Sequence, residues 1–371
     1  MNAFRAGGKR TGQGRHVEFL AQQWSRTQVP FDRIVLMSPR PVTIDGLGDV
    51  TPIEFRHFGS RLPAAVWEQA ALPYEARSAS ILFCPTYTAP VGHRGRFVVM
   101  NHGIYERLPN EFSRAQRLRT TPLHRMSARR ADRVIANSHA TKRDIVDFFD
   151  VDGDKIDVVH PAAAEVFFRR HPPEAIAEES RRVLGREAPY FLFVGKLSRR
   201  RHVPNLIEAF AAVRSQLGLP HMLLVVGPNS ANVDVGGISA AHGVGDDVVY
   251  VDHLEQGPLA HLYAGAEAFV LPTTYEGISQ TMFEAMASGA PVLTVEHPTL
   301  AEGAGDAALA VENPSVEALV DGFRRILEDP ELRRSLSDRG RERARLFSWN
   351  ANATATAEIL DRVARPRDGG R

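Results

Sequence analysis

Short apolar runs alternate with longer amphipathic stretches along most of the chain, which predicts buried strands separated by helices. In the first half this pattern predicts strands at 34–37, 81–83, 97–100, 133–136 and 156–159, and helices at 62–77, 113–130 and 140–149. In the second half it predicts strands at 190–194, 222–226, 248–251, 268–271, 291–295 and 308–311, and final helices at 330–346 and 349–363.

The rhythm breaks between 168 and 189, where prolines and charged residues replace the apolar periodicity. We therefore expect a domain at 1–170, a linker at 171–188 and a second domain at 189–347. Alternating strands and helices are typical of parallel sheets with helices on both faces. The expected fold is α/β, with two doubly wound, Rossmann-like domains facing one another across a cleft.

One feature does not fit this pattern. The glycine-rich segment Gly12-Gln13-Gly14-Arg15 would normally follow a central strand, yet residues 1–10 contain no apolar run able to form one. Either that strand is missing, or another segment takes its place.

Composition and charge narrow the class of protein. The 371 residues are 43% hydrophobic and 24% charged, which is ordinary for a globular chain with room for two cores. The single cysteine, Cys84, lies in an apolar stretch, so a disulfide framework is excluded and a buried thiol is expected. No signal peptide and no membrane-span pattern is visible, which favours the cytoplasm.

Charge is distributed unevenly along the chain. There are 25 basic and 17 acidic residues through Arg170, and 20 basic and 27 acidic residues after it. Either the first half meets an anionic partner or membrane surface, or these are scattered solvated charges. We expect no nucleic-acid partner.

The most informative segment is 271–292, where a strand, a glycine turn and a helix follow one another. The helix begins near Ser279, so the backbone N–H groups of Ile278, Ser279 and Gln280 form an anion site at its positive end. Glu276 and Glu284 flank this turn, and carboxylates bind sugar hydroxyls. Gly277 follows Glu276 in this turn and is a further candidate for donor binding.

A second segment, 193–210, places Lys196 at the carboxyl end of a strand, after Gly195, and Arg201 five residues later. Ligands of open α/β sheets bind at this edge. Two positive charges there can neutralise a leaving diphosphate without a metal ion. Arg199 and Arg200 receive less weight, as solvated neighbours.

With these motifs the chain resembles retaining glycosyltransferase family 4, the glycosyl transferases group 1, over nearly its whole length. The resemblance implies the GT-B fold, a nucleoside-diphosphate sugar donor (UDP- or GDP-sugar), and retention of the anomeric configuration. It implies that Glu284 binds the ribose hydroxyls and that Glu276 contacts the donor sugar. In the family the two cations are usually arginine and then lysine; here Lys196 and Arg201 exchange them, which changes the local geometry.

Further matches lie in the first half. The family has His-Asp after a buried strand, with the histidine contacting the transferred sugar; this chain has His102 followed by Gly103. Gly12 and Gly14 match the family loop near the diphosphate. Asn137-Ser138 also matches, although Ser138 is equally well explained as a helix N-cap.

The ends of the chain complete the resemblance. Phe347-Ser348-Trp349 matches the segment after which the C-terminal helix, 348–365, returns to the first domain. No Asp-x-Asp pattern lies in a suitable place, since Asp152, Asp154, Asp246 and Asp247 read as loop acids, so we expect no metal and no cofactor.

The predicted function is transfer of a hexose to an acceptor hydroxyl in glycan, lipopolysaccharide or glycolipid synthesis. The alternatives are a sugar-nucleotide epimerase or phosphorylase, and a catalytically inactive nucleotide-binding partner protein. A dinucleotide dehydrogenase fits less well, because its glycine motif is incomplete.

The acceptor is predicted to be a saccharide or a lipid-linked molecule. Eight arginines lie in the segment 107–133: Arg107, Arg114, Arg117, Arg119, Arg125, Arg129, Arg130 and Arg133. Either they dock an anionic acceptor, or they hold the chain at the inner face of an anionic bilayer, or they are a solvated helix face.

Overall fold

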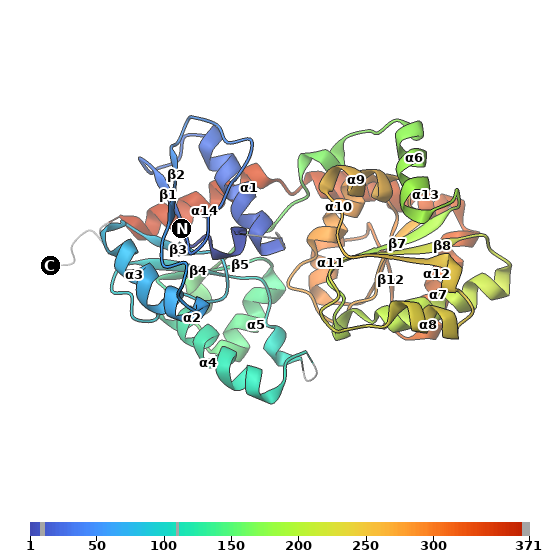
Figure 1. Cartoon of the computed structure of the whole chain (residues 1–371), viewed down its shortest axis with the longest axis horizontal. Helices are drawn as coiled ribbons and strands as arrows, with labels where there is room; N and C mark the ends of the chain where they lie inside the picture. Colours follow the sequence, from blue (N-terminus) through green and yellow to red (C-terminus); the bar gives the residue numbers. More distant parts are fainter. Residues whose placement is uncertain (8–11, 109–110, 366–371) are drawn as a thin grey trace. The chain divides into compact units, whose positions relative to one another are not determined.

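The computed structural model describes residues 1–7, 12–108 and 111–365, which form two compact units. The first unit comprises Met1–Pro161 together with the chain from Ser348 onward, and the second comprises Ala162–Phe347 (Figure 1). The first boundary falls before the predicted position 170. No helix in the described ranges combines the length and the apolar character that a membrane span requires.

Parallel strands form the centre of the first unit. β1 (Ile34–Ser38) pairs with β2 (Ile53–His57). A second group has the order β3-β4-β5-β6, with bounds Leu82–Cys84, Phe97–Asn101, Arg133–Ala136 and Ile156–Val158. The prediction missed β2, whose exposed carboxyl half lacks a clear apolar face. Cys84 is buried, as predicted.

The first three residues join the two groups of strands. The Met37 N–H donates to the Met1 carbonyl at 2.9 Å, and the Ala3 N–H donates to the Met37 carbonyl at 2.8 Å. On the other side the Asn2 N–H donates to the Phe83 carbonyl at 2.8 Å. Neither alternative for the central strand is therefore correct: residues 1–3 themselves lie between the two groups of strands, by backbone pairing that needs no apolar run.

Helices cover both faces of this sheet. Their bounds are α1 (Gly12–Arg26), α2 (Ala64–Val66), α3 (Leu72–Glu75), α4 (Arg114–Arg130), α5 (His139–Phe149) and α14 (Trp349–Ala364). α1 and α14 pack on one face around Leu20, Trp24 and Ala353, and the Trp24 indole N–H donates to the Ala353 carbonyl at 2.9 Å. This contact fixes the C-terminal helix within the first unit.

One predicted helix of this unit is irregular, and one predicted loop is helical. The segment 62–77 is helical from Ala64 to Ser78, but a π-helical stretch, Trp67–Ala71, lies between α2 and α3, and a 3₁₀ turn follows. The segment Gly12–Arg15 is not a loop but the first turn of α1, in which Gly12 is exposed and Gly14 is buried.

The second unit contains a six-stranded parallel sheet of order β12-β11-β10-β7-β8-β9. The strands are β7 (Tyr190–Val194), β8 (Met222–Val226), β9 (Val248–Val251), β10 (Ala268–Leu271), β11 (Val292–Val295) and β12 (Leu309–Val311). They lie where the sequence predicts them. Chain order reverses between β7 and β10, and ligands of such sheets bind outside the carboxyl ends of the strands at this point.

The helices of the second unit flank this sheet (Figure 1). They are α6 (Pro173–Leu184), α7 (Val203–Leu217), α8 (Val235–Ala241), α9 (Gln256–Gly265), α10 (Gln280–Ser288), α11 (Pro298–Ala304), α12 (Val316–Glu328) and α13 (Pro330–Arg345). The segment 171–188, predicted as a linker, contains α6 and lies within the second unit. Pro173 starts this helix and Gly185, with φ +77°, ends it; only Leu184 is fully buried, so its apolar signal is weak.

Candidate functional site

Two glycines shape the carboxyl edge of the second unit's sheet. Gly195 follows β7 with φ +153°, and Gly227 follows β8 with φ +136°. A Cβ atom on Gly195 would lie 1.4 Å from Nη1 of Arg201, and one on Gly227 would lie 2.2 Å from the Gly195 carbonyl oxygen. Both positions therefore require glycine, and the space left at Gly195 holds the Arg201 guanidinium.

Arg201 and Arg200 lie in the loop that follows β7 at this edge. They end a short 3₁₀ turn, Arg199–Arg201, after which α7 begins. Arg201 is only 8% exposed, and its Nη2 lies 2.8 Å from Oε1 of Glu276. Nη1 of Arg200 lies 2.6 Å from the same oxygen. One buried carboxylate thus contacts two guanidinium groups.

The low weight given to Arg200 in the sequence prediction is wrong. Its Nη1 also donates to the Tyr275 carbonyl at 2.7 Å and to Oγ1 of Thr273 at 3.1 Å. Arg199 and Lys196 are exposed. Three consecutive arginines cannot be told apart in a sequence, because the direction of each side chain depends on the 3₁₀ turn.

Glu276 is ionised although it is only 3% exposed. Burial by itself opposes ionisation, but the charges and hydrogen bonds of Arg200 and Arg201 outweigh it, so the pKa of Glu276 lies below its usual value. The cluster therefore keeps one net positive charge from three ionised groups. An edge of this kind attracts an anion.

The second predicted carboxylate has different surroundings. Glu284 lies on α10, is 1% exposed, and accepts hydrogen bonds from the Tyr263 hydroxyl at 3.4 Å and from Nε2 of Gln280 at 3.3 Å. Ser279 caps the helix, since its hydroxyl accepts the Met282 N–H at 3.2 Å. Gly277 and Ile278 are buried in the turn before it. The helix start thus lies near its predicted position.

His102 follows β4 in the first unit. Its Nε2 lies 2.8 Å from the Pro85 carbonyl oxygen, which can only accept, so Nε2 carries the proton. Burial lowers the pKa of His102, and this hydrogen bond only partly offsets the effect. Gly103, where the family has aspartate, has φ +123° and donates its N–H to Oδ1 of Asn101 at 2.9 Å. The side chain is thus a neutral imidazole in a fixed loop.

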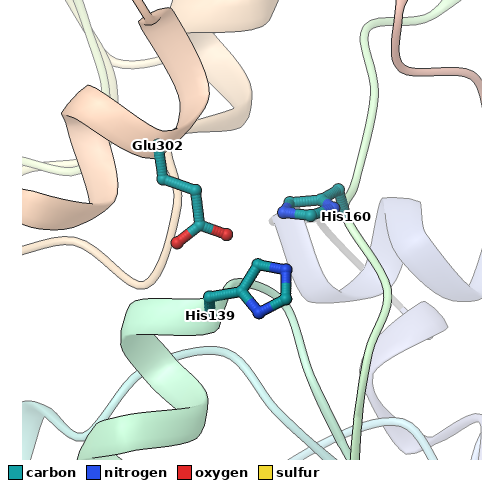
Figure 2. A group of neighbouring side chains, drawn as sticks. All are labelled: His139, His160 and Glu302. Atoms are coloured by element: carbon teal, nitrogen blue, oxygen red, sulfur yellow. The ribbon is translucent and has the colours of Figure 1, made fainter.

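Two further histidines lie at the same edge of this unit's sheet. His139 begins α5 and His160 follows β6, and their ring centroids are 5.9 Å apart. Figure 2 shows both side chains. Glu302, also drawn there, belongs to α11 of the second unit. Ser138 caps α5, since its hydroxyl accepts the Thr141 N–H at 2.9 Å, so its N-cap reading is confirmed.

The loop acids have local partners. Asp152 caps the 3₁₀ turn Gly153–Lys155, and Asp154 lies within that turn. Asp247 is buried and pairs with Arg186 and with Arg214, the latter at 3.0 Å. These contacts explain both segments as parts of the scaffold.

Family models match both units of the chain. The model for Glycosyltransferase Family 4 matches residues 10–165, and that for Glycosyl transferases group 1 matches residues 176–343. The O-antigen chain mannosyltransferase B of Escherichia coli is 26% identical over 224 residues, which are 60% of this chain and 58% of the relative. A D-inositol 3-phosphate glycosyltransferase of Nocardioides sp. is 28% identical over 252 residues, 63% of this chain and 54% of the relative.

The chain therefore spans less than two thirds of the length of these relatives. Solved structures match more of it. WaaG, a glycosyltransferase involved in lipopolysaccharide biosynthesis, has a TM-score of 0.73 at 18% identity, covering 94% of this chain and 96% of that one. HepE of Anabaena, solved with UDP and glucose, has a TM-score of 0.75 at 16% identity, covering 96% and 97%. The two units have the GT-B fold, and the chain belongs to glycosyltransferase family 4.

Proposed function

We propose that this chain is a retaining glycosyltransferase that moves a hexose from a nucleoside-diphosphate sugar to an acceptor hydroxyl in glycan, lipopolysaccharide or glycolipid synthesis. The observation that carries the proposal is the pair of buried arginines around Glu276, beside the start of α10. The net positive charge of Arg200, Arg201 and Glu276 together lies at the carboxyl edge of the sheet, where α/β proteins bind nucleotides. The family membership and the relatives' names support the same chemistry.

The donor diphosphate is proposed to bind at this cationic edge. Arg201, with Lys196 and the backbone N–H groups at 278–280, would stabilise the negative charge that develops as the diphosphate leaves. A single such donor is commonly worth about 10²–10³ in rate. Arg200 joins this set, because it is buried against the same carboxylate. The HepE structures with UDP and UDP-glucose support a UDP-sugar donor, while a GDP-sugar remains the alternative.

The reaction needs no metal in this proposal. The bond between the sugar C1 and the diphosphate oxygen breaks, the acceptor oxygen bonds to C1 on the same face, and the acceptor proton passes to the leaving phosphate. Arginines and N–H groups supply the electrostatic role that a divalent cation has elsewhere. No step of the proposed reaction is assigned to His139 or His160.

The remaining site residues keep the roles that the family resemblance implies. Glu284 is proposed to bind the ribose hydroxyls. In this proposal the hydroxyls replace Gln280 as hydrogen-bond donor to the Glu284 carboxylate. Glu276 and His102 are proposed to contact the sugar, and Gly12 and Gly14 to lie near the diphosphate. At α1 those glycines open a helix, whose N-terminus favours an anion.

For the acceptor we propose an anionic, lipid-linked molecule. In the first unit a groove of about 910 Å³ lies along α4 and is lined by apolar side chains, including Leu118 and Met126, and by arginines. Leu118 is 80% exposed on a helix with little buried surface. A groove lined by both apolar side chains and arginines suits an amphiphile with an anionic head.

Several arginines of the segment 107–133 pair with acidic residues, so fewer of them are available to an anion than the composition predicts. Arg107 pairs with Asp144, Arg129 pairs with Asp150, and Arg133 pairs with Asp157 at 2.8 Å. Arg114, Arg119 and Arg130 remain exposed. Co-sedimentation with anionic and neutral vesicles tests the proposal: binding only to anionic vesicles, weakened by salt, supports it. Equal failure to bind both at low salt contradicts it.

The transfer reaction itself is tested with a panel of UDP-, GDP- and ADP-sugars in the presence of EDTA. We expect one donor to release its nucleotide, with an acceptor extract increasing the rate, and an α-linked donor to give an α-linked product by NMR. Interconversion of the donor without any acceptor would identify an epimerase. Nucleotide binding without turnover would identify an inactive partner protein.

A further inference from the structure

His16 lies directly beside the proposed sugar contact, His102, and no pattern in the sequence singles it out. It projects from α1 into the first unit and is only 2% exposed. Its ring centroid lies 5.5 Å from that of His102, with the two planes at 77°. The two imidazoles are therefore packed edge to face.

The His16 ring also contacts a second aromatic ring, that of Trp349. Trp349, the first residue of α14, lies 5.1 Å from the His16 ring at an angle of 78°. Phe19, one turn further along α1, stacks on Trp349 at 4.5 Å. A ring between two aromatic neighbours cannot turn without displacing one of them, so the orientation of the His16 ring relative to His102 is fixed.

Two other contacts of the His102 ring in the described part of the chain come from a single loop. Nε2 donates to the Pro85 carbonyl, and Tyr87 lies 5.8 Å away at 71°. Both groups belong to the loop after β3, so they move with that loop. His16 is the contact from a different element, a helix anchored to α14, and it fixes the ring relative to the rest of the unit.

We propose that His16 is a positioning residue for the transfer reaction, whose ring holds the plane of His102 so that Nε2 stays bonded to Pro85 and Nδ1 remains the hydrogen-bond acceptor. This inference rests on the proposed function, in which His102 contacts the transferred sugar. His16 acts through ring shape rather than through its nitrogens. Its Nε2 has no hydrogen-bond partner in the described part of the chain, in keeping with this role.

The test compares His16→Leu, which keeps an apolar volume but loses the flat ring, with His16→Phe, which keeps the ring and loses the nitrogens. We expect His16→Leu to lower kcat by about 10- to 100-fold, because displacing a group at the site by about 1 Å can lower the rate by about this factor. The affinity for UDP, whose cationic site is proposed in the second unit, should change little. His16→Phe should have nearly the wild-type kcat and a higher Tm.

A second readout does not depend on activity. The ¹⁵N shifts of the His102 imidazole report its tautomer, and we expect Nε2–H in the wild type and His16→Phe but a mixture in His16→Leu. The control is His221→Ala, which removes another buried histidine, stacked on Phe191 at 5.3 Å in the second unit. It should lower the Tm without changing kcat or the His102 spectrum.

Two results would overturn the inference. One is a His102 tautomer and a kcat that are unchanged in His16→Leu. The other is a His16→Phe variant as impaired as His16→Leu, which would assign the role to a nitrogen. If no donor is turned over by the wild type, the proposed function fails, whereas the NMR comparison still decides whether His16 holds His102.

Discussion

Replacing Glu276 with alanine removes the carboxylate that two buried guanidinium groups contact. The distances are 2.6 Å to Arg200 and 2.8 Å to Arg201, and the side chains of both arginines are 10% exposed. Removing one partner of a buried ion pair commonly destabilises a protein by about 3–5 kcal/mol, because the charge left behind stays desolvated. We expect a loss of this size in the second unit.

The loss can be measured as a shift in the thermal transition of the second unit. In a domain of this size each kcal/mol changes Tm by about 2–4 °C, so Glu276→Ala should lower it by about 6–20 °C. The matched control is Glu187→Ala, which removes an exposed partner 3.0 Å from Arg181. Exposed pairs contribute about 1 kcal/mol or less, so the control should change Tm by a few degrees at most.

The same variant tests the charge that the donor is proposed to meet. Without Glu276 the two guanidinium groups lose the carboxylate that they share, and the diphosphate of UDP would replace its negative charge. Saturating UDP should therefore raise the Tm of Glu276→Ala by more than it raises that of the wild type. A Tm equal to that of Glu187→Ala would refute the energetic reasoning, and an equal or smaller response to UDP would refute the diphosphate placement.

The other predictions concern neighbouring positions. Glu284→Ala should weaken nucleotide binding by about 1.5–3 kcal/mol in a calorimetric titration, because hydrogen bonds to a charged acceptor are lost, whereas the exposed Glu208→Ala should not. Gly195→Ala should lower both Tm and turnover, since its Cβ would lie 1.4 Å from Arg201, whereas Gly236→Ala, with nothing within 4 Å, should leave activity unchanged. EDTA should leave wild-type turnover unchanged, and dependence on added Mg²⁺ or Mn²⁺ would disprove the metal-free mechanism.

Much of the fold follows from local patterns in the sequence. The six strands of the second unit are continuous apolar runs because helices cover both faces of the sheet, and such runs are easily recognised. The predictions failed where structure depends on distant contacts. α6 has few apolar residues among many charged ones and only Leu184 is buried, so it was interpreted as a linker although its apolar positions are spaced as in a helix. Residues 1–3 join the sheet through backbone hydrogen bonds that do not depend on apolar side chains.

The candidate site shows the same division. Glu276, Glu284 and Ser279 were predicted because a strand, turn and helix fix them within one short segment. Arg200 and His16 were not, because their importance arises from side chains that meet across the fold. The Arg200 contact with Glu276 spans 76 residues of sequence, and the ring that backs His16 comes from the C-terminal helix.

The central claim is that the cationic edge around Arg201 binds the diphosphate of a nucleotide-sugar donor. It is tested most directly by calorimetric titration of UDP and GDP into the wild type, Arg201→Ala and the control Arg199→Ala, whose side chain is exposed. We expect the wild type to bind one of the two nucleotides. The Kd should rise about 10- to 150-fold in Arg201→Ala, because charge-assisted hydrogen bonds are lost. The Kd should be unchanged in Arg199→Ala. Equal affinity of the wild type and Arg201→Ala, or no binding of either nucleotide to the wild type, would contradict it.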